Sequence, residues 1–274
     1  MVPAGTRSGG TASRRLWAVL AAAAMLALAL ALPAAEQAGA APDFRWQGSV
    51  ETGRTVTVRG VSGSITAARG SGEVVVEAVK TARRSDPDDV TIEVIEDGDG
   101  ILVCAVYPSG WFRQNRCARG DSYRMSSRNN DVNVAFTVSV PDGVHLNARN
   151  TNGVVRVSGL SGDVSATTVN GNIEAESAGQ VSARTVNGRI DAAVGASPRE
   201  DLSFRTVNGR VRLALPAEVD ADLSLRTVNG GIDSDFPVDV RGRWGPRSAS
   251  GQLGQGGPDI DVSTVNGGIE VRRR

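Results

Sequence analysis

The sequence predicts an all-β fold, a β-solenoid in which short strands stack coil upon coil. Three observations lead to this prediction. The tetrapeptide Thr-Val-Asn-Gly recurs five times, apolar and polar residues alternate before each copy, and 33 glycines accompany only five Phe, two Tyr and four Trp. A thin stacked core of Val, Ile, Leu and Ala needs few aromatic side chains, whereas a globular domain of 274 residues usually has more.

The tetrapeptide places asparagine and glycine at fixed points of the chain, and a variant, Asn-Thr-Asn-Gly, precedes the five full copies. The asparagines are Asn152, Asn170, Asn187, Asn208, Asn229 and Asn266, and the glycines of the full copies are Gly171, Gly188, Gly209, Gly230 and Gly267. Asn-Gly favours positive φ, because glycine lacks Cβ and asparagine tolerates the left-handed region. We therefore expect a structural turn at each copy.

Ahead of each asparagine, apolar and polar residues alternate as in half-buried strands. Val181 and Ala183 flank Ser182, for example, and the other full copies repeat this pattern. Two architectures fit: an antiparallel β-meander with tight hairpins, or a solenoid whose coils stack about 4.8 Å apart. Stacking favours identical residues at equivalent positions and allows asparagine amides to form ladders, whereas a meander does not need this identity. We favour the solenoid and keep the meander as the alternative.

Residues 1–40 have the composition of a secretory signal peptide. Arg7, Arg14 and Arg15 precede an apolar stretch at 16–32, and a small-residue cleavage site ends at Ala40. The alternative is an uncleaved anchor, although the apolar stretch is short for a membrane span. We expect an exported protein of the periplasm, the cell surface or the extracellular space, without a transmembrane span in the mature chain; the export route stays open.

Residues 41–274 are predicted to form a single β-repeat domain. Its first part, 41–149, contains degenerate coils and a loop closed by a disulfide. Its second part, 150–274, contains the regular coils, with an insertion at 237–258 that is rich in glycine and arginine. Cys104 and Cys117 are the only cysteines, and an oxidising compartment should join them. So short a loop gains on the order of 3 kcal/mol from closure.

The charged residues and potential metal ligands of the chain exclude several classes of function. Thirty basic residues balance thirty acidic ones, so no basic surplus attracts nucleic acid. Two cysteines and the single His145 cannot supply the four ligands of a zinc site. Residues 97–100 alternate aspartate and glycine as calcium loops do, but the remaining ligands are missing, and a hairpin turn is expected. We expect no metal and no cofactor.

One column of the repeats suggests a binding surface. Arg184, Arg205 and Arg226 occupy the same position, three residues before asparagine. Stacking would bring these guanidiniums together, with Asp201 and Asp222 on the same face to offset their repulsion. The row could bind an acidic polysaccharide, a phosphate polymer or lipid head groups. The alternative is that these arginines serve only the fold.

Two further surfaces are candidates of lower rank. The aligned residues Arg156, Glu174, Asp191, Arg212, Asp233 and Glu270 have mixed signs, which indicates a solvated ladder of weak ion pairs. The disulfide loop contains Trp111 and Arg113, and aromatic residues among arginines can bind a glycan face or an acidic partner. The alternative for that loop is a segment tied down over the end of a sheet.

Signals of catalysis are absent. His145 follows a turn and no nucleophile motif accompanies it, and neither Gly-x-Ser-x-Gly, His-Glu-x-x-His nor a phosphate-cradling loop occurs. The acidic residues have no spacing that implies a convergent pair. We therefore assign no catalytic residues and expect that the protein is not an enzyme.

The repeats resemble the bacterial putative-adhesin family of β-strand-repeat proteins of unknown function. The Thr-Val-Asn-Gly copies carry this resemblance, together with four further segments of the chain. These are Glu-Ala-Val-Lys at 77–80, Asp-Phe-Pro-Val at 235–238, Gly-Gln-Gly-Gly-Pro at 254–258 and Ser-Thr-Val-Asn-Gly-Gly-Ile at 263–269. The resemblance covers most of the chain after about residue 44. It implies an exported right-handed β-solenoid and supplies no catalytic residues.

Three hypotheses of function follow. The first is an exported, non-catalytic adhesin-like binding or scaffold protein, which contacts an envelope polysaccharide or another envelope protein. The second is a carbohydrate-active β-helix enzyme acting on an acidic polysaccharide, which predicts a groove bordered by residues 108–130 or 237–258. The third is a structural spacer without a ligand.

Overall fold

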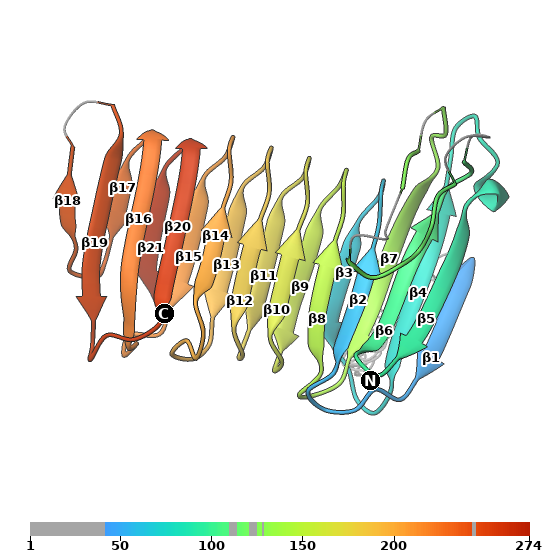
Figure 1. The fold of residues 1–274 in the computed structure, drawn as a ribbon, viewed down its shortest axis with the longest axis horizontal. Helices are drawn as coiled ribbons and strands as arrows, with labels where there is room; N and C mark the ends of the chain where they lie inside the picture. Colours follow the sequence, from blue (N-terminus) through green and yellow to red (C-terminus); the bar gives the residue numbers. More distant parts are fainter. Residues whose placement is uncertain (1–41, 110–113, 121–124, 128, 243–244) are drawn as a thin grey trace, which may run out of the picture. The chain divides into compact units, whose positions relative to one another are not determined.

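The computed structural model describes residues 42–109, 114–120, 125–127, 129–242 and 245–274. The predicted signal peptide lies outside these residues, as do Trp111 and Arg113. Within the described ranges the chain is all-β, with one short 3-10 turn, η1 (Pro87–Asp89), and its strands form two mixed sheets (Figure 1). The all-β prediction is thereby confirmed.

The smaller sheet has ten strands. Their spatial order is β1 (Phe44–Gly48), β4 (Val74–Thr81), β7 (Asn133–Val140), β3 (Ile65–Arg69), β9 (Val155–Leu160), β11 (Ile173–Ser177), β13 (Ile190–Val194), β15 (Val211–Leu215), β21 (Ile269–Arg273) and β17 (Ile232–Ser234).

The larger sheet has eleven strands. Their spatial order is β18 (Asp239–Arg241), β19 (Arg247–Leu253), β16 (Ala221–Asn229), β20 (Asp259–Asn266), β14 (Leu202–Arg205), β12 (Val181–Arg184), β10 (Val164–Thr167), β8 (His145–Arg149), β2 (Thr55–Arg59), β6 (Gly100–Val106) and β5 (Thr91–Asp97).

Each repeat contributes one strand to each sheet, and we call such a segment a coil. Equivalent residues of successive coils pair in parallel and in register: Val164 pairs with Val181 in the larger sheet, and Ile173 with Ile190 in the smaller. An antiparallel meander is therefore wrong for the repeats. Antiparallel pairing occurs toward the ends of the sheets, between β1, β4 and β7, between β5 and β6, and between β16, β19 and β18.

The core lies between the two sheets, because alternate residues of each strand turn inward. In β12, for example, Val181 and Ala183 are buried while Ser182 is half-buried and Arg184 is exposed. The buried cluster consists mainly of Val, Ile, Leu and Ala, and its few aromatic members include Phe136. Small aliphatic side chains thus fill the space between the sheets, as the low aromatic content predicts.

The last coil is not last in space. Residues 259–273 pair between two earlier coils, so that β20 lies between β14 and β16, and β21 between β15 and β17. The sequence suggested instead that coils stack in chain order. The insertion explains the difference. It contains the antiparallel strands β18 and β19, and β19 covers one edge of β16. The returning chain pairs with the other edge of β16 and fills the gap beside β14.

The first half of the chain contains a degenerate coil and the expected disulfide. Strands β2 and β3 stack on β8 and β9, and Ser62 at their corner bridges to Asn152 of the first Asn-Gly corner. Cys104 and Cys117 are bonded, with 5.8 Å between their Cα atoms. Both cysteines pack with Leu102 in a small buried cluster apart from the main core. The segment around Cys117 is thus tied down over β6.

Candidate functional site

Three residues of Thr-Val-Asn-Gly, namely the threonine, the asparagine and the glycine, have structural roles in the stacking of the coils. The threonine of every full copy is buried, and its hydroxyl donates to a glycine carbonyl of the neighbouring coil. Thr185 donates to Gly171 over 3.0 Å, and Thr206 donates to Gly188 over 2.9 Å. A buried hydroxyl needs such a partner, so the threonine column is structural.

The asparagines form a continuous side-chain ladder at the corner, as stacking predicts. From Asn170 onward, the Nδ2 of each asparagine donates to the Oδ1 of the asparagine before it in the stack over 2.7–2.8 Å. In spatial order the ladder runs Asn152, Asn170, Asn187, Asn208, Asn266 and Asn229. Asn266 lies between Asn208 and Asn229 in this order, because the last coil inserts between two earlier coils. All six of these asparagines take part in the ladder.

The glycines are required by close stacking rather than by positive φ. Among the glycines of the full copies only Gly267 has a positive φ, of 159°, which is close to extended backbone. The sequence expectation of a left-handed turn is therefore wrong for Gly171, Gly188, Gly209 and Gly230. A Cβ on Gly188 would lie 1.9 Å from the carbonyl oxygen of Gly171. The backbone of one corner thus occupies the space that a side chain of the next would need.

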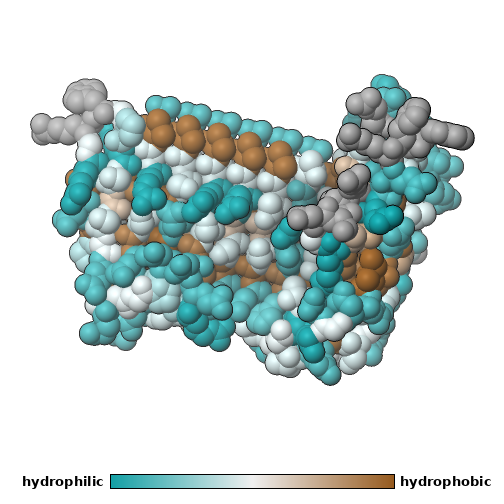
Figure 2. All heavy atoms as spheres, in the orientation of Figure 1, coloured by the Kyte–Doolittle hydropathy of each residue, from teal (hydrophilic) through white to brown (hydrophobic). Residues whose placement is uncertain are grey.

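Valine is the position of the repeat that points outward. Each of the five valines is 39–40% exposed, and together they form what we call the valine row. In spatial order it contains Val169, Val186, Val207, Val265 and Val228. Figure 2 shows an apolar row along one edge of this face, beside a hydrophilic row. Sequence reasoning did not single out this row, although its periodicity is visible in the repeat.

The arginines predicted from the sequence lie on the outer face of the larger sheet, two residues before the valines. We call this aligned position the arginine column, and in spatial order it contains Arg59, Arg149, Thr167, Arg184, Arg205, Ser263 and Arg226. Arg184 and Arg205 are direct neighbours, as expected. Arg226 is separated from them by Ser263, because β20 lies between β14 and β16.

The carboxylate that offsets the column is Asp261, which sequence reasoning missed. Arg205 Nη2 lies 2.5 Å from Asp261 Oδ2, and Arg226 Nη1 lies 3.6 Å from its Oδ1. The expected partners, Asp201 and Asp222, are four residues along the strand, about 13 Å away. Asp261 replaces the serine that the other full copies have at this position, and this exception was the available signal.

Apart from Asp261, which stands in the serine column, the outer face of the larger sheet separates its charges into columns. The arginine column is followed by a column of small polar residues that includes Ser165, Ser182 and Ser224. The next outward column contains the carboxylates Asp163, Asp201, Asp259 and Asp222. The arginine column and these carboxylates are about 13 Å apart, which is more than the screening length of about 8 Å at physiological salt, so they attract each other only weakly. Among the described residues, Arg184 has no ion-pair partner.

The outer face of the smaller sheet combines both signs in one column, as predicted. We call this column the ion-pair ladder, and in spatial order it contains Arg156, Glu174, Asp191, Arg212, Glu270 and Asp233. Arg212 bridges Asp191 at 3.7 Å and Glu270 at 3.0 Å. The guanidinium of Arg156 lies 3.1 Å from Glu174. These charges are satisfied within the protein.

Two further arginines reinforce this ladder. Asp191 first, and Glu174 after it, raise the pKa of Arg189 above its ordinary value. Arg272 donates to Asp233 over 2.6 Å and lowers the pKa of that carboxyl below its ordinary value. Both shifts favour the charged forms of Arg189 and Asp233.

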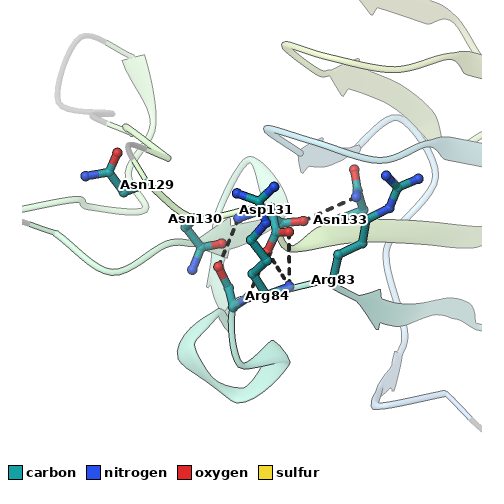
Figure 3. A pocket seen from close by; sticks show the side chains of 7 residues that line it. Arg83, Arg84, Asn129, Asn130, Asp131 and Asn133 are labelled. Carbon is teal, nitrogen blue, oxygen red and sulfur yellow. Dashed lines mark hydrogen bonds between the residues drawn. The ribbon is translucent and has the colours of Figure 1, made fainter.

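A cavity of about 690 Å³ lies where β4 ends and β7 begins, and it includes Arg83, Arg84 and residues 129–131 (Figure 3). The carboxylate in this lining, Asp131, already accepts hydrogen bonds from the protein. The backbone N–H and then the hydroxyl of Ser85 hold the pKa of Asp131 below its ordinary value. The backbone N–H of Arg84 also donates to this carboxylate over 3.2 Å. Asp131 therefore fixes the loop, and the cavity contains no free acid.

An open groove of about 390 Å³ crosses the acidic and serine columns and contains His145, Asp163 and Asp201. Asp163 is occupied by Arg199 at 3.1 Å and by the N–H of Gln180 at 2.9 Å. The described lining of this groove includes none of residues 108–130 or 237–258, which the enzyme hypothesis named as borders, whereas the cavity of Figure 3 includes Asn129 and Asn130. Within the described ranges no cluster of three or more His, Cys, Asp or Glu side chains could hold a metal ion.

The disulfide loop is only partly described. Asn115 fastens it, because its amide donates to the carbonyls of Tyr107 and Ser126 over 2.8 Å and accepts the N–H of Ser126 over 2.9 Å. These contacts agree with a loop tied down over the sheet. The prediction that Trp111 and Arg113 bind a partner concerns residues outside the described ranges.

Comparison with known proteins gives distant likenesses. No protein-family model matches the chain, and no curated protein matches it significantly. A solved structure of a putative cell adhesion protein from Clostridium sporogenes ATCC 15579 aligns with 85% of this chain and 100% of its own, at TM-score 0.43 and 10% identity. A putative adhesin from Bacteroides fragilis NCTC 9343 aligns with 84% of this chain and 96% of its own, at TM-score 0.28 and 14% identity. At these values neither likeness assigns a function.

In the part of the chain that the structure describes, no helix is long and apolar enough to cross a membrane.

Proposed function

We propose that the chain is an exported, non-catalytic adhesin-like protein of the bacterial cell envelope, folded as a right-handed β-solenoid. Its larger sheet binds an acidic envelope polysaccharide through the arginine column. The parallel, in-register pairing of equivalent coils supports the solenoid. The separation of charge on the larger sheet carries the binding proposal, because among the described residues it leaves Arg184 without an ion-pair partner, while Arg205 and Arg226 share the single carboxylate of Asp261.

The arginine column has the spacing of a polymer site. Adjacent strands are about 4.8 Å apart, so Arg184 and Arg205 present like charges side by side. A polyanion lying across the strands relieves this repulsion, and each guanidinium can hold a carboxylate through two N–H donors. Several weak contacts along one chain then add up to useful affinity.

The neighbouring serine column favours a sugar polymer over other anions. Ser182 and Ser224 are half-buried beside the arginines, and Asn147 continues their column. Hydroxyl and amide groups donate and accept hydrogen bonds, as sugar hydroxyls do. An acidic polysaccharide would thus meet guanidiniums and hydroxyls in adjacent columns of one face.

Binding to polygalacturonate, with neutral dextran as the comparison, tests the proposal. We expect binding of the acidic polymer alone, weakening from about 0.1 M to about 1 M salt as the screening length falls to about 3 Å. The triple variant Arg184→Ser, Arg205→Ser, Arg226→Ser should bind at least about tenfold more weakly.

A matched control removes three arginines from the opposite face: Arg156→Ser, Arg189→Ser and Arg212→Ser. The change in net charge is the same, but binding should remain within about twofold of the wild type. Equal losses in both triple variants would show a general charge effect and reject the site. No binding by the wild type would favour the spacer, and shortened polymer chains would favour the enzyme.

The exported location has its own test. We propose that residues 1–40 are removed, which predicts Ala41 as the first residue of the mature protein. N-terminal sequencing of the protein recovered outside the cytoplasm checks this. A mature chain that retains the apolar stretch at 16–32 would instead support the anchor.

A further inference from the structure

A cavity of about 400 Å³ lies where the arginine column and the valine row meet the hairpin of β18 and β19. Its lining includes Arg226, Val228, Pro246, Arg247, Ser263 and Val265. This volume is within the range of sites that bind small molecules. The cavity is separate from the ion-pair ladder, which lies on the other sheet.

Ser263 creates the space. It stands in the arginine column between Arg205 and Arg226, where the other full copies have arginine or threonine. A serine there leaves a gap between the two guanidiniums. The hairpin then closes the gap from one side, because Arg247 pairs opposite Thr227 at the end of β16.

The walls and floor of the cavity are largely apolar. Val228 and Val265 are about 40% exposed and face the same side of the corner, and Pro246 adds a third apolar surface. The threonines of the lining do not offer free hydroxyls. Thr227 and Thr264 are buried, and each donates to a glycine carbonyl over 2.9 Å.

The rim of the cavity is cationic. Among the described residues of the lining, Arg226 and Arg247 are basic and none is acidic. Arg226 is 66% exposed and lies 3.6 Å from Asp261, which is longer than a hydrogen bond. Its N–H donors can therefore turn to an anion without breaking a close pair.

We propose that this cavity binds an apolar chain or ring that carries one carboxylate, with the carboxylate at Arg226 and the apolar part between Val228, Val265 and Pro246. The combination is the usual one for such sites, in which apolar walls supply contact area and a few polar groups fix orientation. The inference goes beyond the polysaccharide proposal, because it names a different ligand and requires only one arginine of the column.

Titration with decanoate tests the site, with decanol and decyltrimethylammonium as comparisons. Decanoate should bind one molecule per chain, decanol should bind at least about tenfold more weakly, and the cation should not bind. Equal binding of decanoate and decanol would show that Arg226 does not bind the carboxylate. Absence of decanoate binding would overturn the proposal.

Two pairs of variants locate the ligand. Ser263→Arg restores the arginine of the column and fills the cavity, whereas Thr167→Arg adds an arginine to the same column at β10. Decanoate binding should fall at least about tenfold in the first and stay unchanged in the second. Val265→Ser and Val186→Ser change the same position of the repeat, and only Val265→Ser should weaken binding. Equal effects within either pair would reject the cavity as the site.

The two proposals fail separately. Ser263→Arg should abolish decanoate binding while it maintains or increases binding of polygalacturonate, because it adds a guanidinium to the column. If the polymer does not bind and decanoate does, the polysaccharide proposal alone is wrong. If polymer binding survives and decanoate does not bind, the cavity proposal alone is wrong.

Discussion

The two outer faces of this protein come from the same coils but use charge differently. On the smaller sheet, arginines and carboxylates share one column, and Arg212 lies between Asp191 and Glu270. On the larger sheet the signs occupy separate columns except at Asp261, and Arg184 and Arg205 are neighbours. The first arrangement satisfies its charges internally. The second leaves Arg184 without an ion-pair partner among the described residues, and the proposal that the larger face binds a partner rests on this difference.

The largest effect is expected from a substitution that disrupts the stacking of the coils, on which both faces depend. Gly188→Ala would place Cβ 1.9 Å from a backbone oxygen of the neighbouring corner, which cannot move without shifting the coil. We expect a loss on the order of 4 kcal/mol in the free energy of unfolding, measured by denaturant titration. Gly98→Ala, where a Cβ meets nothing within 4 Å, should cost less than about 0.5 kcal/mol. Similar losses at both glycines would refute the stacking argument.

The disulfide secures one end of the larger face. Replacing Cys104 and Cys117 by serine together should lower the free energy of unfolding by about 3 kcal/mol, because the reduced chain regains loop entropy. It should also expose Leu102, which belongs to the same buried cluster as the two cysteines. Denaturant titration of the double variant checks the stability, and protease cleavage after residue 104 checks the exposure. An unchanged midpoint would contradict the assigned role.

The asparagine ladder joins the coils at the corner between the faces. Asn208→Ala removes both hydrogen bonds of one rung, to Asn187 and to Asn266. We expect a loss of about 1 to 2 kcal/mol, limited by water that replaces the amide. Val207→Thr changes the adjacent exposed residue and keeps its β-branch, so it should cost less than about 0.5 kcal/mol. If both variants behave alike, the ladder does not stabilise the stack.

Single arginine substitutions should have opposite effects on the two faces. Arg212→Ser removes the bridge between two carboxylates and should cost up to about 1 kcal/mol. Arg184→Ser relieves repulsion from Arg205 and should be neutral or stabilising by a few tenths of a kcal/mol. Thermal unfolding at low and high salt measures the stability change of each variant. The difference between the two variants should shrink at high salt, because salt screens the charges. Equal destabilisation by both substitutions would contradict the distinction between the faces.

Acid should weaken the smaller face through Asp233. Arg272 lowers the folded pKa of this carboxyl below the ordinary value of 3.8. The stability that this pair contributes is present above the unfolded pKa and is lost as pH falls from about 4 through the lower folded pKa. Asp233→Asn should lower the unfolding midpoint near pH 7, where the wild type has the pair, and should reduce the dependence of the midpoint on pH below about 4, where the wild type loses it. A steeper dependence in the variant would show that the sign is wrong.

The sequence could predict whatever the repeat specifies locally. Alternation around Ser182 predicts a strand, and identical asparagines predict a ladder. The insertion of β20 between β14 and β16 could not be predicted, because which edge of β16 remains free depends on where the hairpin packs. That insertion separates Arg226 from Arg205 and supplies Asp261 as their partner. The glycines were predicted correctly as corner residues but for the wrong physical reason.

The central claim is that the larger face, and not the smaller, contacts an acidic polymer. Arginine-selective dicarbonyl modification of the wild-type protein, with and without polygalacturonate and read by mass spectrometry, tests this most directly. The account predicts that the polymer protects Arg184, Arg205 and Arg226. Modification of Arg156, Arg189 and Arg212, the arginines of the smaller face, should stay unchanged. Protection confined to the smaller face, or equal protection of both faces, would contradict it.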